Sequence, residues 1–393
     1  MATVVTDRQL SGGDWRFYLS PQTNQGAVNA NPVFQPVRRT DGGLTEAVTY
    51  TTSAEVSLDY NPSAQIQDGR EYTAEIPFEL NKQTVNYLIA AIYGTEAVVT
   101  QTSSLIASTA GGFQSTDASF TNFNVGDFVF VTGFTNALLN RTYRITAKAD
   151  ADNISVEPAP AVVVAAGDSV TFNTSRTTNA NDATYYTGQE RVIDQSKVDD
   201  IDYQTPYDGL INTMSLEIGE AGVITGSMAL QFGNKVSGTS AVSGQTDSAV
   251  GSDAPLSAVQ NLANWYLAGV SAICSLKSAT ISISNENQRD QAAGCIDRYV
   301  RGQPTITIEG VSRSSIANSM VIREYRNNST RIGFGVEFDH GSGEKTVISI
   351  PQCVVTEWSM PKAQSVISNN EFSMVAEKDA ALGYAIGIFR NWS

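Results

Sequence analysis

The stretch QPTITIEGVSRSSIANSMVIREYRN, residues 303–327, joins an alternating strand to an amphipathic helix. Ile306 and Ile308 fall on one side of the expected strand, and Glu309 falls on the other side with the polar residues, as a half-buried strand requires. Apolar residues then recur at helical spacing, at Ile316, Met320 and Val321. The stretch therefore predicts a strand that packs against the helix that follows it.

The same pattern occurs once before, in REYTAEIPFELNKQTVNYLIAAIYG, residues 70–94. Ile76, Phe78 and Leu80 alternate with polar residues, and the helical positions are Val85, Leu88, Ile89 and Ile92. A strand is expected before each unit, in AEVSLDY (54–60) and in SATISISNEN (278–287). The order of a strand, a second strand and a helix thus occurs twice, which indicates an internal duplication.

Further strands are expected after each unit. A hairpin is predicted over 214–232, where Met214, Leu216 and Ile218 share one face and GEAG turns the chain. The second half supplies RIGFGVEF (331–338), KTVISIPQCVVTEWSM (345–360) and NNEFSMVAEKD (369–379). These alternating runs place the chain in the mainly β class.

Two segments differ from this plan. Residues 95–183 contain short strands and Gly or Asn turns and no helical pattern, which predicts a small all-β module inserted into the first half. Residues 233–256 are rich in Gly, Ser and Thr and are expected to be a flexible linker or an arm that orders against a partner. A polar arm rich in Asn and Gln is expected at the N-terminus.

The composition limits the function classes. The chain has 393 residues, 41% hydrophobic and 17% charged, which fits two or three β-rich domains. Its 40 Asp and Glu against 25 Lys and Arg give a formal charge of −15, and no basic cluster is present. Because nucleic-acid binding needs clustered positive charge, the acidic balance fits either an ordinary solvated surface or a surface that repels a polyanion.

The cysteines and the N-terminus indicate the compartment. Cys274, Cys295 and Cys353 are odd in number and lack metal-site spacing, so we expect reduced thiols in a protein assembled in a cytoplasm. The first residues, MATVVTDRQLSGGDW, contain no apolar signal region, and no stretch is long enough to span a membrane. We therefore expect no membrane partner.

No motif predicts catalysis. The single histidine, His340, lies in EFDHGSGEK, where we expect a solvated turn rather than a catalytic imidazole. The Asp-rich runs at 150–153 and 197–202 lack the spacing of a calcium loop, and no Gly-rich loop fits a nucleotide. We expect no enzyme activity, no cofactor and no metal site, although a glycosidase-like carboxylate pair stays open among so many strand-borne acids.

The acidic residues in the expected strands share one property, because each lies opposite the apolar face. They are Glu55, Asp59, Glu75, Glu79, Glu217, Glu309, Glu357 and Glu371. Solvation of a polar face explains each acid singly. Together, at matching places in both repeats, they could cover one continuous acidic sheet.

Four segments, in their order, resemble the tail tube proteins (major tail proteins) of long-tailed, non-contractile bacteriophages. They are TSAEVSLDYNPSAQIQDGREYTAEIPFELNKQTVNYLIAAIYG (52–94), GDFVFVTGFTNALLNRTYRITAKADADNISVEP (126–158), GLINTMSLEIGEAGVITGSMALQFGNK (209–235) and ISIPQCVVTEWSMPKAQSVISNNEFSMVAEKDAALGYAIGIFRN (348–391). The resemblance covers nearly the whole chain and is one of segment order rather than of a catalytic motif.

The resemblance implies a fold of two tandem tail-tube domains, each a β-sandwich or barrel with a flanking helix. The first would comprise residues 1–94 and 184–232, interrupted by the insertion at 95–183, and the second residues 257–393 after the linker at 233–256. Family members form rings that stack into a tube. Since one chain would supply two domains, three chains are expected to form a ring with pseudo-sixfold symmetry. About 24 tilted strands give a bore of roughly 35–40 Å, wider than a DNA duplex.

The resemblance also gives the acidic strand faces a role, as the lining of a bore through which DNA slides without specific binding. The implied partners are other copies of the chain, the tape measure protein and other tail proteins, and the implied location is the virion, after assembly in the host cytoplasm. Which strand face lines the bore stays open. The alternative is a secreted or cell-surface adhesin or carbohydrate-binding protein, for which a secretion signal is expected.

Overall fold

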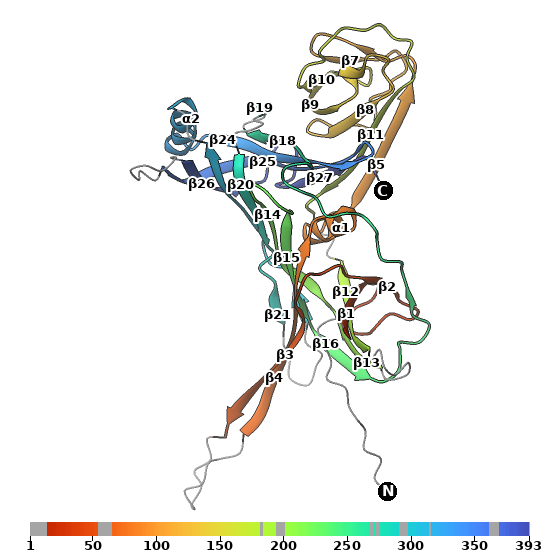
Figure 1. Ribbon diagram of the computed structural model, residues 1–393, viewed down its shortest axis with the longest axis vertical. Coiled ribbons are helices and arrows are strands. Elements are labelled where there is room, and N and C mark those ends of the chain that lie inside the picture. Colours follow the sequence, from red (N-terminus) through yellow and green to blue (C-terminus); the bar gives the residue numbers. More distant parts are fainter. Residues whose placement is uncertain are drawn as a thin grey trace, which may run out of the picture.

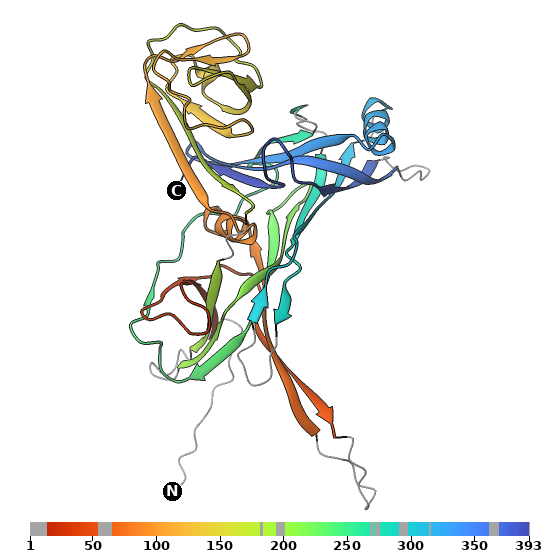
Figure 2. The ribbon, with the colours of Figure 1, turned by 180° about the vertical axis from the view of Figure 1, so that it is seen from behind.

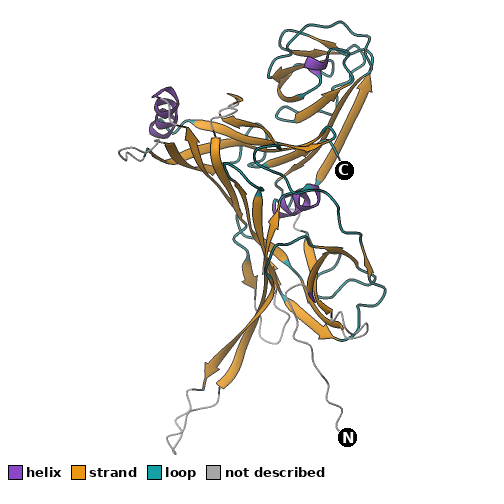
Figure 3. Cartoon of the chain, viewed as in Figure 1, coloured by secondary structure: helices purple, strands orange, loops and turns teal. Residues whose placement is uncertain are grey.

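The computed structural model describes residues 14–53, 65–180, 184–193, 201–267, 270–271, 276–290, 298–313, 316–360 and 369–392. In these residues the chain is mainly β, with two α-helices (Figures 1 and 3). The molecule is elongated, and an insertion rich in short strands lies at one end of its long axis (Figure 1). No helix in the described segments is long and apolar enough to span a membrane.

Eight antiparallel strands from both halves of the chain form one continuous run of neighbours. In spatial order they are β3 (Gly43–Thr52), β4 (Gln65–Glu79), β15 (Thr225–Phe232), β14 (Leu210–Ile218), β20 (Leu276–Ser284), β23 (Thr305–Arg313), β26 (Asn369–Ala376) and β25 (Glu344–Ser359). The strand expected at 54–60 lies outside the described residues. The partner of β4 is β3, whose Thr-rich segment sequence analysis did not identify as a strand.

The first four strands of this run and the last four have the same pairing order. We number the strands of each set by their order in the chain, so that strands one to four are β3, β4, β14 and β15 in the first set and β20, β23, β25 and β26 in the second. In each set strand one pairs with strand two, strand two with strand four, and strand four with strand three. The pairing of the third and fourth strands contains a register shift in both sets, between Ile211 and Thr213 and between Val355 and Glu357. The β14–β20 ladder joins the two sets.

A helix follows the second strand of each set. Helix α1 (Lys82–Ala91) packs on β14, and its N-terminus carries a capping box in which Asn81 and Thr84 each accept a hydrogen bond from the other's backbone N–H. Val85, Leu88 and Ile92 of this region are buried, as the helical spacing predicted.

Helix α2 (Ile316–Asn327) packs on β25, and here the expected buried face is wrong. Ile322 is buried, whereas Met320 and Val321 are 46% and 42% exposed. Successive helical residues are separated by about 100°, so the face that carries Ile322 turns Met320 and Val321 away from the sheet.

Strand β25 extends beyond its pairing with β26. Its first part pairs with β24 (Arg331–Gly341) on one edge and with β27 (Gly387–Arg390) on the other. β24 also pairs with β18 (Leu262–Leu267), which turns back through β19 (Val270–Ser271). A short hairpin of β21 (Gln288–Asp290) and β22 (Arg298–Val300) lies between β20 and β23 in the chain.

A second sheet packs beside α1 (Figure 2). It has the order β16 (Asn234–Gly238), β13 (Ile201–Tyr207), β12 (Tyr185–Ile193), β1 (Trp15–Gln22), β2 (Val33–Pro36) and β17 (Thr246–Asp247). The expected N-terminal arm contributes β1 and β2, and its residues 1–13 lie outside the described residues. The expected linker at 233–256 contributes β16 and β17. The guanidinium of Arg191 ties these segments together, since it stacks 3.8 Å from the Tyr18 ring and pairs with Asp247.

The described residues between 95 and 180 contain a buried cluster of their own. The strands of this insertion are β5 (Glu96–Ser103), β6 (Ala107–Ser108), β7 (Gly112–Gln114), β8 (Phe128–Thr132), β9 (Thr142–Lys148), β10 (Asn153–Glu157) and β11 (Val170–Thr178), with a 3-10 turn at Ala137–Leu139. Phe128 and Phe130 dock the insertion on Val347 and Phe389. The buried carboxylate of Glu337 accepts hydrogen bonds from Thr142 of the insertion and from Tyr266 and Lys345 of the second half.

The main core runs without interruption through both halves. Apolar residues of β4, β14 and β15 belong to the same buried cluster as those of β20, β23 and β26, together with Phe17 and Leu19 of the second sheet. The opposite face of the eight strands carries the polar residues of each strand. The apolar side thus faces α1 and the second sheet.

We predict that Thr84→Val lowers the free energy of unfolding by about 1–3 kcal/mol, because the buried N–H of Asn81 loses its acceptor. Urea denaturation followed by circular dichroism measures the change. Thr84→Ser keeps the hydroxyl and should cost less than half as much. Equal losses in the two variants would contradict the prediction, because Thr84→Ser keeps the hydroxyl that accepts the hydrogen bond from Asn81.

Candidate functional site

The polar face of the eight-stranded run is the candidate site. One line of directly opposed residues crosses seven of its strands, from β4 to β25. In order, these residues are Glu79, Thr225, Glu217, Thr280, Glu309, Ser373 and Glu357. We call this line the acidic row. It alternates a carboxylate with a hydroxyl at every strand.

The alternation limits repulsion between the carboxylates. Like charges directly opposite each other on neighbouring strands destabilise a sheet, and a hydroxyl residue separates each pair here. Since neighbouring strands lie about 4.8 Å apart, successive carboxylates are roughly 10 Å apart, close to the Debye length of about 8 Å at physiological salt. The row therefore presents an almost continuous negative potential.

The carboxylates of the acidic row face solvent. Glu217, Glu309 and Glu357 are exposed and Glu79 is half-buried. Among the described residues, no Lys or Arg forms an ion pair with any of the four; the ion pairs of the chain involve other acids, such as Glu220 with Lys277 and Glu344 with Lys82. The negative charge of the row is therefore not neutralised within the described chain.

The other predicted acids lie beside the row or outside the described residues. Glu75 lies on the same face of β4, opposite Ala229 and Gly43. Glu371 is opposite Val311 and Ser359, and it accepts a hydrogen bond from the Ser359 hydroxyl at 3.1 Å. Glu55 and Asp59 fall in the segment that the structure does not describe.

The carboxylates of the row were predicted from the sequence, and the hydroxyl residues between them were not. Thr225, Thr280 and Ser373 occur in strands that were predicted, on their polar sides. Their position opposite glutamates depends on the register between strands far apart in the chain. Only the alternation within each strand was visible locally.

The face is hollowed near the second half. A hollow of about 640 Å³ is lined by Glu309, Glu357 and Glu371 and by Arg326 of α2. The described residues contain no group of three His, Cys, Asp or Glu side chains placed to hold a metal ion. The hollow is part of the acidic face rather than a separate site.

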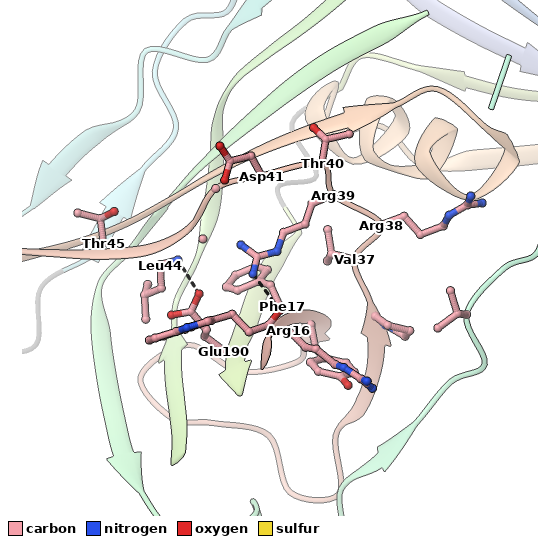
Figure 4. A pocket seen from close by; sticks show the side chains of 16 residues that line it. Arg16, Phe17, Val37, Arg38, Arg39, Thr40, Asp41, Leu44, Thr45 and Glu190 are labelled. Atoms are coloured by element: carbon pink, nitrogen blue, oxygen red, sulfur yellow. Dashed lines mark hydrogen bonds between the residues drawn. The ribbon is translucent and has the colours of Figure 1, made fainter. Parts of the chain in front are cut away.

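A larger hollow of about 1070 Å³ lies between the second sheet and the start of β3 (Figure 4). Here the carboxylate of Glu190 accepts a hydrogen bond from the backbone N–H of Leu44 at 3.2 Å, and Arg39 donates to the carbonyl of Trp15. Burial raises the pKa of Glu190, and Arg39 opposes this shift. These contacts hold β3 against β1 and β12, which is a structural role.

The expectation for His340 is wrong in its setting. The residue lies in β24 rather than in a solvated turn, its Nε2 is 2.9 Å from the Thr346 hydroxyl, and its ring meets Trp392 edge-on. Burial, assisted by the nearby Lys82 charge, lowers the pKa of His340 to about 4. A neutral, half-buried imidazole packed against an indole has a structural role. Of the three cysteines, Cys353 is buried with its pKa raised to about 12 by burial, and the other two lie outside the described residues.

The two ends of the eight-stranded run are open. β3 pairs with β4 along one edge, and residues 355–359 of β25 pair with β26 along one edge. In the described chain no strand pairs with the outer edge of either segment. Exposed edges of this kind are templates for pairing with another chain.

We predict that His340 makes stability fall as the pH is lowered from about 6.5 to about 4. In this window the unfolded chain binds a proton at this imidazole and the folded chain does not, so stability is complete above 6.5. The loss is at most about 3 kcal/mol. Urea unfolding at several pH values should show a flatter curve for His340→Gln than for the natural chain.

The control uses the fact that the chain has a single histidine. The imidazole proton signals in an NMR titration of the folded protein therefore belong to His340. A midpoint near 6.5 in the folded state would contradict the buried neutral setting.

Comparison with known proteins agrees with this architecture. A family model described as phage tail tube protein matches residues 12–367, which is most of the chain. No curated protein matches the chain in sequence.

Proposed function

The chain belongs to the phage tail tube protein family, and from this membership and the acidic row we propose that it forms the wall of a tail tube whose bore is lined by the polar sheet face. The proposed product is a stack of rings through which the phage genome leaves the virion. The observation that carries the proposal is the alternation of carboxylates and hydroxyls across seven strands.

The charge of the row suits this role. A DNA duplex carries one negative charge per about 1.7 Å of its axis. A basic lining would hold the duplex by releasing its counterions, whereas an acidic lining gives no such gain. Carboxylates without ion-pair partners among the described residues therefore favour sliding over binding.

The arrangement of the other elements supports the same orientation. α1 and the second sheet lie on the side of the sheet opposite the acidic row, because Phe17 and Leu19 share the buried cluster with the apolar residues of β4 and β15. The insertion docks on β25 and β27 through aromatic residues. In the proposed tube these elements form the outer surface.

We infer further that the two four-strand sets are copies of one tube domain. Their shared pairing order, the bulge at the same place and a helix after the second strand support a duplication. Glu75 and Glu309 each precede the first helical residue by seven positions. Since β14 and β20 already join two copies within a chain, three chains suffice for a pseudo-sixfold ring.

The remaining partners follow from this role. Rings stack on one another, the tape measure protein occupies the bore before ejection, and other tail proteins contact the ends of the tube. The protein assembles in the host cytoplasm and resides in the virion of a long-tailed phage with a non-contractile tail. A buried, unreactive thiol at Cys353 is compatible with cytoplasmic assembly.

We expect the charge-reversed variant Glu217→Lys/Glu309→Lys to form tubes and to slow genome delivery several-fold, because the new cations bind phosphates. DNA release from purified virions, triggered in vitro and followed with an intercalating dye, measures the rate. Glu324→Lys is the matched control, since this glutamate is exposed on α2 and belongs to none of the strands that carry the acidic row. An unchanged release rate in the double variant would refute the proposed lining.

The ring itself gives a second test. Native mass spectrometry of the smallest closed species should yield three times the chain mass of 42.0 kDa. A closed ring of six chains would contradict the trimer while leaving a tube possible. A monomer at every concentration would contradict tube formation.

A further inference from the structure

The two open edges of the eight-stranded run are matched to each other, and the internal β14–β20 junction supplies the template for how they meet. At that junction the third strand of one set pairs with the first strand of the next, and Thr213 lies opposite Ser284. The open edges are again a third strand, β25, and a first strand, β3. This step rests on the proposed function, since it requires a second copy of the chain.

Equivalent residues in the two sets follow from the registers. Glu75 and Glu309 correspond because both precede a helix by seven positions. Gly43 lies opposite Glu75, and Thr280 lies opposite Glu309, so Gly43 and Thr280 also correspond.

The third strands are matched in the same way. Ala229 lies opposite both Thr213 and Glu75, on the strands to either side of it. Ser373 lies opposite both Glu357 and Glu309 in the same way. Both Thr213 and Glu357 are the first paired residue after the bulge. Two independent observations, the ladder and the bulge, therefore make Thr213 and Glu357 equivalent.

The register of the β14–β20 junction can be applied to the open edges of β25 and β3. Thr213 opposes Ser284, which lies four residues beyond Thr280. The residue four positions beyond Gly43 is Ala47. We propose that residues 355–359 of β25 pair antiparallel with residues 45–49 of β3 in a second copy of this chain, with Glu357 opposite Ala47 and Ser359 opposite Thr45.

The side chains agree with this register. Ala47 and Glu71 are direct partners within β3 and β4, so a carboxylate again follows an uncharged residue in the next copy. Unlike the glutamates of the acidic row, Glu71 forms an ion pair with Arg289 at 3.1 Å. The alternation of a carboxylate with an uncharged residue is kept across the junction. A shift by two residues would extend the row instead to Gly69 or Thr73, which carry no charge.

The register also sets the geometry of the ring. The acidic row connects Glu79 on β4 with Glu309 on β23, four strands further along the sheet. The residue of β4 that is equivalent to Glu309 is Glu75, which lies four residues from Glu79 in the same strand. The stagger is thus four residues for every four strands. For about 24 strands this gives a strand tilt of roughly 35° and a backbone diameter of roughly 45 Å, within the range of closed barrels.

Paired cysteines test the register directly. Directly opposed residues in antiparallel strands have Cβ atoms about 4.5–5.5 Å apart, and diagonal neighbours are about 7–8 Å apart, too far for a disulfide. The in-register variants are Thr45→Cys/Ser359→Cys and Ala47→Cys/Glu357→Cys. The shifted control is Thr45→Cys/Glu357→Cys, and the natural chain controls for its own cysteines.

After mild oxidation of assembled rings, at least one in-register variant should run as covalent dimers and closed trimers on non-reducing gels, and the shifted control should not. A crosslink in the shifted control overturns the register. The absence of a crosslink from every variant, although rings form, also overturns it, and both outcomes leave the tube function standing. A crosslink in a single-cysteine variant would show that β3 pairs with β3, or β25 with β25, of another copy. This outcome would overturn the pairing of β25 with β3. Failure of the natural chain to form rings would instead contradict the proposed function.

Discussion

The pairing of β14 with β20 is the interaction on which the rest of the molecule depends. It joins β14, at the inner edge of the first set, to β20, at the inner edge of the second, along six residue pairs. Without it, Met214 and Ile283 would face separate cores, whereas here both lie in one buried cluster. The same ladder aligns Glu217 with Thr280, so it is also the step that carries the acidic row from one half of the chain to the other. Packing and charge pattern therefore have one cause.

The acidic row explains why a sheet face with so much negative charge is tolerated. A glutamate at every strand would place like charges about 5 Å apart across the ladder. The hydroxyl residues double that distance while keeping the face polar. Because the exposed carboxylates lack ion-pair partners within the described chain, their charge stays available to a polyanion nearby. An arrangement that only solvated the sheet would need neither this regular spacing nor its continuity across both halves.

Local patterns predicted the elements and missed their arrangement. Ile306 and Ile308 alternate within five residues, so their strand and its polar side were evident, and the same holds for Ile76 and Phe78. The order of the strands depends on pairings between segments more than a hundred residues apart, as between β4 and β15, and no local pattern encodes them. The second sheet escaped prediction for the same reason, since β1, β12 and β17 lie far apart in the chain and meet around Arg191. His340 was misplaced because its burial comes from Trp392, fifty-two residues later.

In the assembled tube, the acidic row should line the bore. A cryo-electron microscopy reconstruction of purified tails, at a resolution that traces the strands, tests this position most directly. We expect Glu217, Glu309 and Glu357 to face the bore, β25 to continue into β3 of the next copy, and α1 to lie outside the barrel. A reconstruction with these glutamates on the outer surface, or with α1 facing the bore, would contradict this expectation.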